Sequence, residues 1–236
     1  MEKIKNIRKR LRHQRSVRRR KLGLSTPTQI ICVSFIIVIA LGTLLLTLPI
    51  ASRHGRLDVL NAMFTATSAT CVTGLVVRDT WTQFTWFGQA VVLLLIQVGG
   101  LGLVTLTSFF ALAMRRRMGF RDLRLLGESV SADGYDQAKS VLKIVVGLAA
   151  MFEGIGILLL LFAFVPQFGL EGVWISVFTA ISAFCNAGFD LFGRFGAYSS
   201  LAPYVNNYYV QAVIMFMIIS GGLGFMVWVE LCQWYI

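Results

Sequence analysis

The chain has 236 residues, of which 56% are hydrophobic, 14% are charged and 18 are phenylalanine. One soluble core of this length cannot bury so much apolar side chain, so we expect lipid to be the solvent for most of the chain. The formal net charge is +11, but the basic residues form separate blocks rather than one patch, which argues against nucleic-acid binding.

Four apolar runs have about the ~20 residues that a helix needs to cross a bilayer. They lie at residues 30–48, 84–114, 141–165 and 209–229. Eleven of the 22 Lys and Arg precede residue 22, and seven more lie between Arg115 and Lys143. By the positive-inside rule, the N-terminus is cytoplasmic and the protein is a multi-pass protein of the cell membrane. The basic arm is also placed to contact anionic lipid headgroups.

A short sequence occurs twice. FTATSATCVTGL at 64–75 and FTAISAFCNAGF at 178–189 are identical at seven of twelve positions, and GGLG at 99–102 recurs at 221–224. The first pair is offset by 114 residues and the second by 122, so the second copy is eight residues longer between these landmarks. We therefore divide the chain into a basic arm (1–29), a first repeat (30–114), a cytoplasmic connection (115–140) and a second repeat (141–236).

Each repeat contains a short element between its two spans. Residues 57–69 allow a helix of about 13 residues, or roughly 20 Å, which cannot cross a bilayer and return. Charged residues on both sides of it hold its ends on the outer side, so it should be re-entrant, buried in protein or lining a wet cavity. Two crossings per repeat make the repeats parallel, unlike those of inverted-repeat carriers. The expected fold is an all-α membrane protein of two parallel helix–re-entrant pore loop–helix repeats.

The short helices would end near Ala69 and Phe184, with their partly negative C-terminal ends inside the membrane. Backbone carbonyls after them can replace the hydration shell of a monovalent cation when several loops form a ring. Gly74 and Gly188 suit this role because glycine permits the φ/ψ values that turn carbonyls toward one axis. The alternative is that these small residues only let helices pack closely.

For the GGLG sequences, we prefer close packing or a local bend to a hinge or gate. The glycines concerned are Gly99, Gly100, Gly102, Gly221, Gly222 and Gly224.

These sequences, with QVGGLG at 97–102, NAGF at 186–189 and SGGLGF at 220–225, resemble the Trk/Ktr/HKT superfamily of potassium transporters. The chain is most similar to the membrane subunit of the bacterial Ktr system. The resemblance implies potassium uptake through a selectivity filter, often sodium-dependent, and a cytoplasmic ring of nucleotide-binding regulatory subunits. The implied filter strands are Cys71, Val72, Thr73, Gly74, Leu75 and Val76, and Cys185, Asn186, Ala187, Gly188, Phe189 and Asp190. The implied K⁺ ligands are the backbone carbonyls of Val72, Thr73, Asn186 and Ala187.

Members of this superfamily have four helix–loop–helix units, whereas this chain has two and resembles the N-terminal half of a four-repeat, potassium-channel-like pore. Either the second half is another polypeptide, or two copies form a homodimer around one pore, or the chain is a truncated product. The alternative function is a non-transporting membrane protein that assembles with or regulates a full-length transporter.

Two acidic residues have more than one interpretation. Glu153 lies in the middle of an apolar run, where an ionisable group is costly, so it either hydrogen-bonds to a neighbouring helix or the absent half, or takes part in the ion path. Asp190 is the last residue of the implied second filter strand, where its carboxylate either concentrates cations or is simply solvated.

The remaining polar residues do not suggest an enzyme. The five arginines of the connection are expected to set topology rather than to dock a regulatory ring: Arg115, Arg116, Arg117, Arg121 and Arg124. The cysteines, at 32, 71, 185 and 232, have no metal-ligand spacing. There is no nucleophile–base pair, phosphate-binding Gly-Lys-Ser/Thr loop or hydride-cofactor fingerprint, so we expect neither catalysis nor an organic cofactor.

Overall fold

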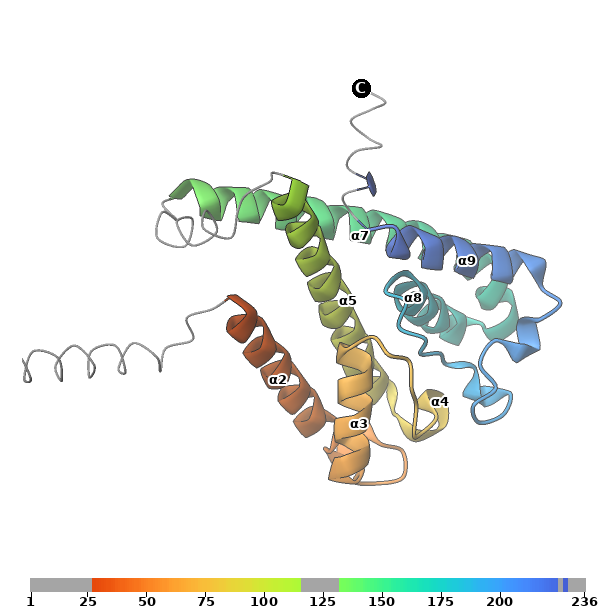
Figure 1. The fold of residues 1–236 in the computed structure, drawn as a ribbon. Helices are drawn as coiled ribbons and strands as arrows, with labels where there is room; N and C mark the ends of the chain where they lie inside the picture. Colours follow the sequence, from red (N-terminus) through yellow and green to blue (C-terminus); the bar gives the residue numbers. More distant parts are fainter. Residues whose placement is uncertain (1–26, 116–131, 225–226, 229–236) are drawn as a thin grey trace, which may run out of the picture. The chain divides into compact units, whose positions relative to one another are not determined.

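The computed structural model describes residues 27–115, 132–224 and 227–228. Their regular elements are all helices, as predicted, and no strand is found among them. The chain divides into two compact units, Met1–Val38 and Ile39–Ile236, and the site lies entirely in the second. The helices, labelled in Figure 1, are α2 (Pro27–Leu46), α3 (Val59–Thr70), α4 (Thr80–Gln83), α5 (Trp86–Arg115), α7 (Ala132–Phe168), α8 (Leu170–Phe184) and α9 (Tyr208–Gly222). Three 3-10 turns, Pro49–Ala51, Phe192–Arg194 and Ala202–Tyr204, lie between them.

The four long helices coincide with the four predicted apolar runs, but two of their ends differ. Helix α7 begins at Ala132, well before residue 141, because hydropathy marks the lipid-facing part of a helix and not its polar extension. Helix α9 ends at Gly222, so the prediction of one continuous helix over 209–229 is wrong. Its last backbone bond runs from Leu223 N to Ile219 O, and Gly224 then takes a left-handed φ of 80°.

By length and composition, Ile144–Phe168 is the one segment of the described residues that can cross a membrane. The segments Cys32–Leu46, Trp86–Gly102 and Tyr208–Gly222 are shorter apolar helices by the same measure. The arm before residue 27 lies outside the described residues, as do Arg116, Arg117, Arg121, Arg124 and Cys232.

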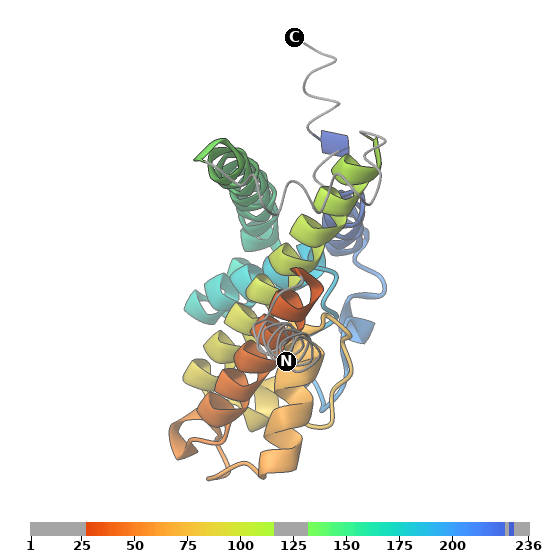
Figure 2. The ribbon, with the colours of Figure 1, turned by 60° about the vertical axis from the view of Figure 1, so that its left-hand side comes forward.

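Both short helices pack against the second long helix of their own repeat. Helix α3 lies beside α5, while α8 packs against α7 and α9, and α5 also contacts α8 (Figures 1 and 2). At the α5–α8 contact, Trp86 stacks on Trp174 with ring centroids 5.7 Å apart. The indole Nε1 of Trp174 donates a hydrogen bond to Oε1 of the fully buried Gln89 at 2.8 Å. Helix α5 therefore connects the two short helices.

An aromatic cluster fixes the segment that follows the second loop. Phe164 of α7 meets the rings of Phe192 and Tyr204 at centroid distances of 5.5 and 5.4 Å. Phe195 packs edge-on against Phe168 at the end of α7, at 5.8 Å. Each of the residues Phe164, Phe192 and Tyr204 is at most 4% exposed. Aromatic pairs at such distances stabilise a packing arrangement beyond their buried area, so this segment is held firmly on α7.

Candidate functional site

The first loop is tied to the end of α3 by three successive backbone amides. The amide of the C-cap residue Cys71 donates to Thr67 O at 2.8 Å, that of Val72 to Ala69 O at 3.3 Å and that of Thr73 to Ser68 O at 2.9 Å. These bonds satisfy carbonyls that every helix leaves unpaired at its C-terminus. The Ser68 hydroxyl then donates to Leu75 O at 2.7 Å, which closes the loop back onto the helix.

The second loop has the same bonds 114 residues later. The amide of Cys185 donates to Ile181 O at 2.9 Å, that of Asn186 to Ala183 O at 3.0 Å, that of Ala187 to Ser182 O at 2.8 Å, and the Ser182 hydroxyl donates to Phe189 O at 2.6 Å. Repetition in the sequence is therefore accompanied by repetition of the local geometry.

The backbone is left-handed twice in each loop. Val72 and Asn186 have φ of 56° and 58°, and Gly74 and Gly188 have φ of 76° and 72°. For glycine this conformation is ordinary, but for a β-branched valine it is an outlier. Such residues cost about 1–3 kcal/mol each and persist where the surrounding structure forces them, typically at functional sites.

The amide bonds also determine where two carbonyls point. In a trans peptide, the C=O of one residue lies opposite the N–H of the next. Because the amides of Thr73 and Ala187 point back to Ser68 and Ser182, the carbonyls of Val72 and Asn186 point away from their short helices. Both carbonyls are among the four cation ligands that the family resemblance implied.

Among the residues that the structure describes, the carbonyl oxygens of the four predicted ligands accept no hydrogen bond. These are Val72, Thr73, Asn186 and Ala187. By contrast, the carbonyls of Leu75 and Phe189 are occupied by the serine hydroxyls. Of the four residues, Ala187 is buried, Val72 is half-buried, and Thr73 and Asn186 are exposed. A buried backbone carbonyl without a partner is rare, so Ala187 O is the oxygen that most needs one, and a cation would supply it.

The two loops meet at their glycines. A Cβ built on Gly74 would lie 2.8 Å from Ala187 O and 3.3 Å from the Cα of Gly188, and one built on Gly188 would lie 3.3 Å from the Cα of Gly74. A side chain at Gly74 would thus be both strained and crowded. The structure brings together the two stretches that the sequence repeat singled out.

The GGLG glycines bring the second long helix of each repeat onto these loops. A Cβ on Gly99 would overlap Thr70 O, and a Cβ on Gly221 would overlap Phe184 O, the last carbonyl of α3 and of α8 respectively. A Cβ on Gly100 would lie 2.6 Å from Cys185 Sγ. Gly222 and Gly224 have no such contact, since their nearest neighbours are 3.8 Å away or beyond 4 Å. Gly99, Gly100 and Gly221 therefore lie at close helix–loop contacts, whereas Gly222 and Gly224 do not.

Glu153 of α7 makes the interhelical hydrogen bond that was one interpretation of this residue. Its Oε1 accepts from Gln97 Nε2 of α5 at 2.8 Å, and the side chain is 8% exposed. Gln97 Oε1 in turn lies 4.0 Å from Cys185 Sγ, at the start of the second loop. Sequence analysis missed Gln97, although an amide in an apolar run was a usable signal.

Two carboxylates lie in the segments that follow the two loops. Asp190 accepts a hydrogen bond from Phe192 N at 2.9 Å, and burial raises the pKa of its carboxyl. Asp79, which the sequence marked only as one of the charges flanking the first short element, is 7% exposed and caps α4 through Thr82 N at 2.8 Å. A cavity of about 200 Å³ lies beside Asp190, between α8 and α9, and Thr179 is among its lining residues.

Comparison with known proteins relates this arrangement to a family. The model of the TrkH family, described as cation transport protein, matches residues 4–235. The potassium/sodium uptake protein NtpJ of Enterococcus hirae is 36% identical over 89% of this chain and 46% of its own length. The Ktr system potassium uptake protein B of Bacillus subtilis is 39% identical over 86% of this chain and 44% of its own length, and that of Vibrio alginolyticus is 38% identical over 84% and 43%.

The chain thus spans less than half the length of these curated relatives. The match nevertheless covers nearly all of this chain, at identities well above 30%. This helical membrane protein belongs to the TrkH family of cation transport proteins, within the Trk/Ktr superfamily.

Proposed function

We propose that the chain supplies two of the filter loops of a channel-like potassium uptake pore. The observation that carries the proposal is the pair of loops with matching hydrogen bonds, unpaired carbonyls at Val72 and Asn186, and mutual contact at Gly74 and Gly188. A dehydrated cation needs several oxygens at once, and carbonyls from several loops can provide them.

The electrostatics of the short helices support the same function. Each helix ends at the residue before its filter strand, so the partial negative charge of about half an elementary charge at its C-terminus lies next to the proposed ion path. The long helices bring Gly99 and Gly221 against the last carbonyls of these helices, which fixes both ends in place. A re-entrant loop of this kind is tolerated inside a bilayer when protein surrounds it.

Two loops are only part of a ring, so the pore requires further loops. We propose that these come from a second half-length region or from a second copy of the chain, with the repeats parallel and the N-terminus cytoplasmic. One relative is named a potassium/sodium uptake protein and another a protein of the Ktr system, which supports potassium as the transported ion and a role in an assembly of several components. Sodium dependence and a cytoplasmic regulatory ring enter the proposal only through the family resemblance of the sequence.

The test replaces Gly74 with Ser and measures the ratio of potassium to sodium uptake in cells that lack their own potassium transporters. Gly55→Ser is the matched control, because Gly55 is also left-handed, with φ of 85°, but a Cβ there meets nothing within 4 Å. We expect Gly74→Ser to lower the ratio and Gly55→Ser to leave it unchanged. If Gly74→Ser and Gly55→Ser insert equally into the membrane and have the same potassium-to-sodium uptake ratio, Gly74 is not part of a selectivity filter.

A further inference from the structure

The segment between the filter strand and the second long helix is longer in the second repeat than in the first. From Gly74 to the start of α5 at Trp86 the chain is eight residues shorter than from Gly188 to the start of α9 at Tyr208. The eight extra residues between the two repeated motifs therefore lie after the filter strand and before the second long helix. It forms two 3-10 turns and the bends between them.

One side of this segment is fixed on its own repeat. Phe192 and Tyr204 pack against Phe164, and the Tyr204 hydroxyl donates to Gln167 Oε1 at 2.7 Å. The hydroxyl of Ser199 donates to Phe192 O at 2.7 Å, which closes the segment on itself. A base this well packed can hold the residues between its ends in one position.

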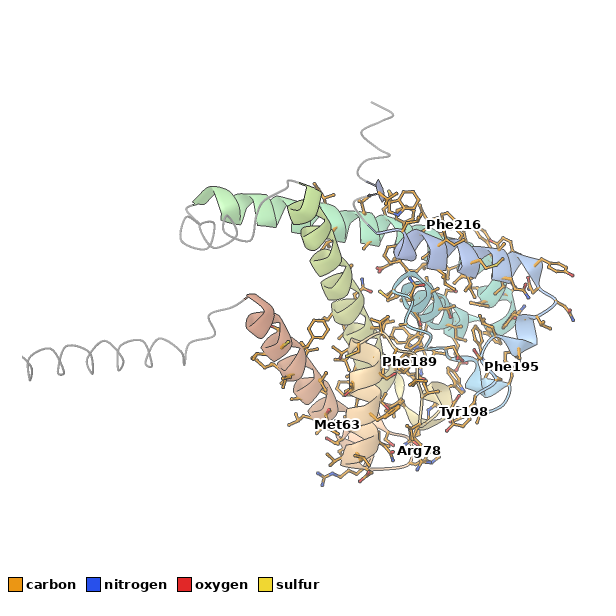
Figure 3. All side chains as sticks on the ribbon, in the orientation of Figure 1. Met63, Arg78, Phe189, Phe195, Tyr198 and Phe216 are labelled. Carbon is orange, nitrogen blue, oxygen red and sulfur yellow. The ribbon has the colours of Figure 1, made fainter. Side chains whose placement is uncertain are left out.

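The other side of the segment reaches the first repeat. The Tyr198 hydroxyl donates to Val77 O at 2.9 Å, and the Tyr198 amide donates to Asp79 Oδ2 at 3.1 Å. Figure 3 shows Tyr198 close to Arg78, which lies between these two partners in the chain. A Cβ on Gly193 would overlap the Asp79 carboxylate, so this contact is also tight.

Asp79 is well placed to receive the segment. Its other oxygen accepts from Thr82 N at 2.8 Å and from Thr82 Oγ1 at 2.9 Å. A buried carboxylate that accepts several hydrogen bonds is held in one orientation. Val77 directly follows the proposed first filter strand, so the contact is made at the outer end of that strand.

Backbone strain occurs in this segment as well as in the filters. Tyr198 and Ser200 have φ of 63° and 48°, and the other non-glycine residues with positive φ in the described part of the chain are Val72 and Asn186. Strain of this kind survives where surrounding contacts force it. Its presence in both filter loops and in the segment that bridges them indicates that the three form one constrained unit.

We propose that residues 192–204 act as a clamp that fixes the outer end of the first filter relative to the second, with Tyr198 and Asp79 as positioning residues for ion selectivity. The inference rests on the proposed filter function. A carbonyl ring discriminates between cations only while its oxygens keep their spacing, and the Tyr198 hydroxyl restrains the carbonyl of Val77 next to that ring.

The test compares Tyr198→Phe with Tyr209→Phe. The Tyr209 hydroxyl donates to Leu159 O, also at 2.9 Å and also in an exposed position, so both variants lose the same kind of bond and only one loses it at the clamp. Two quantities are measured: the potassium-to-sodium uptake ratio in transport-deficient cells, and the rise in melting temperature of the purified protein when KCl replaces NaCl. A ligand that binds only the folded state raises the melting temperature.

We expect Tyr198→Phe to lower the potassium-to-sodium uptake ratio several-fold and to reduce the rise in melting temperature that KCl gives over NaCl. Tyr209→Phe should change neither quantity. A merely structural bond would lower the melting temperature equally in both salts and leave the ratio unchanged, which would overturn the clamp. If wild-type protein shows neither potassium uptake nor a KCl-specific rise, the proposed function fails first. If wild type shows both and Tyr198→Phe matches it, only the clamp fails.

Discussion

Helix α9 carries two adjacent glycines with opposite surroundings. A Cβ on Gly221 would overlap the carbonyl oxygen of Phe184 and lie 3.3 Å from its Cα, while a Cβ on Gly222 would have one neighbour within 4 Å, Asn186 Nδ2 at 3.8 Å. The Phe184 carbonyl is backbone at the end of α8, so it cannot rotate away as a side chain can. We therefore expect Gly221→Ala to move α9 away from the second filter and Gly222→Ala to be tolerated.

The magnitude comes from the difference between the two variants. Replacing glycine by alanine in a helix gains up to about 1 kcal/mol, and this gain is similar at two neighbouring positions. Overpacking at Gly221 costs about 1–3 kcal/mol, which therefore remains as the difference in unfolding free energy. For a protein of this length each kcal/mol shifts the melting temperature by about 2–4 °C. Gly221→Ala should melt about 2–12 °C below Gly222→Ala.

The assay is thermal unfolding of both purified variants in the same detergent, together with the potassium-to-sodium uptake ratio of each in cells. Gly221→Ala should lower the melting temperature and the ratio, because the carbonyl it displaces lies directly before the Cys185 cap. Equal melting temperatures for the two variants would show that α9 does not pack on Phe184 O as described.

Three further results are expected. Ser182→Ala removes the buried hydroxyl bonded to Phe189 O, so it should cost about 1 kcal/mol and lower potassium selectivity in the uptake assay; unchanged selectivity would show that this bond does not shape the filter. Asp190→Asn should raise the apparent Michaelis constant for external potassium at low salt. Because burial raises the pKa of Asp190, the wild-type carboxylate should be protonated at a higher pH than an ordinary aspartate. The wild-type Michaelis constant should therefore rise toward that of Asp190→Asn as external pH falls, and a constant difference between the two Michaelis constants at all pH values would contradict this. Glu153→Gln keeps an oxygen that accepts the hydrogen bond from Gln97 Nε2 but removes the negative charge, so it should reduce uptake with little loss of membrane insertion, and wild-type uptake would exclude a role for the Glu153 charge.

The sequence was sufficient for features that depend on local pattern. Apolar runs located the long helices, and the repeated stretch located α3 and α8 with their C-terminal ends within a residue of Ala69 and at Phe184. Hydropathy could not locate helix ends that depend on backbone geometry, and so it missed the break at Gly224. The polar start of α7 was missed for the related reason that lipid exposure, and not helicity, makes a run apolar.

Features that depend on pairing between distant residues were not predictable. Tyr198 and Asp79 are 119 residues apart, and neither stands in a motif. Gln97 and Glu153 are paired only because α5 and α7 approach each other. The roles of the glycines were also only partly predictable. The sequence marked the GGLG positions, but only the packing of the helices shows that Gly99 and Gly221 face carbonyl oxygens and that Gly222 does not.

The central claim is that carbonyl oxygens of Val72, Thr73, Asn186 and Ala187 hold a monovalent cation. The most direct measurement is anomalous X-ray scattering from crystals of the protein in which thallium(I), a heavy substitute for potassium, replaces it. We expect an anomalous peak within coordination distance of carbonyls from both loops, and we expect this peak to disappear when excess potassium, but not sodium, is added. A protein that takes up thallium in cells while its crystals show peaks only away from these loops would contradict the claim.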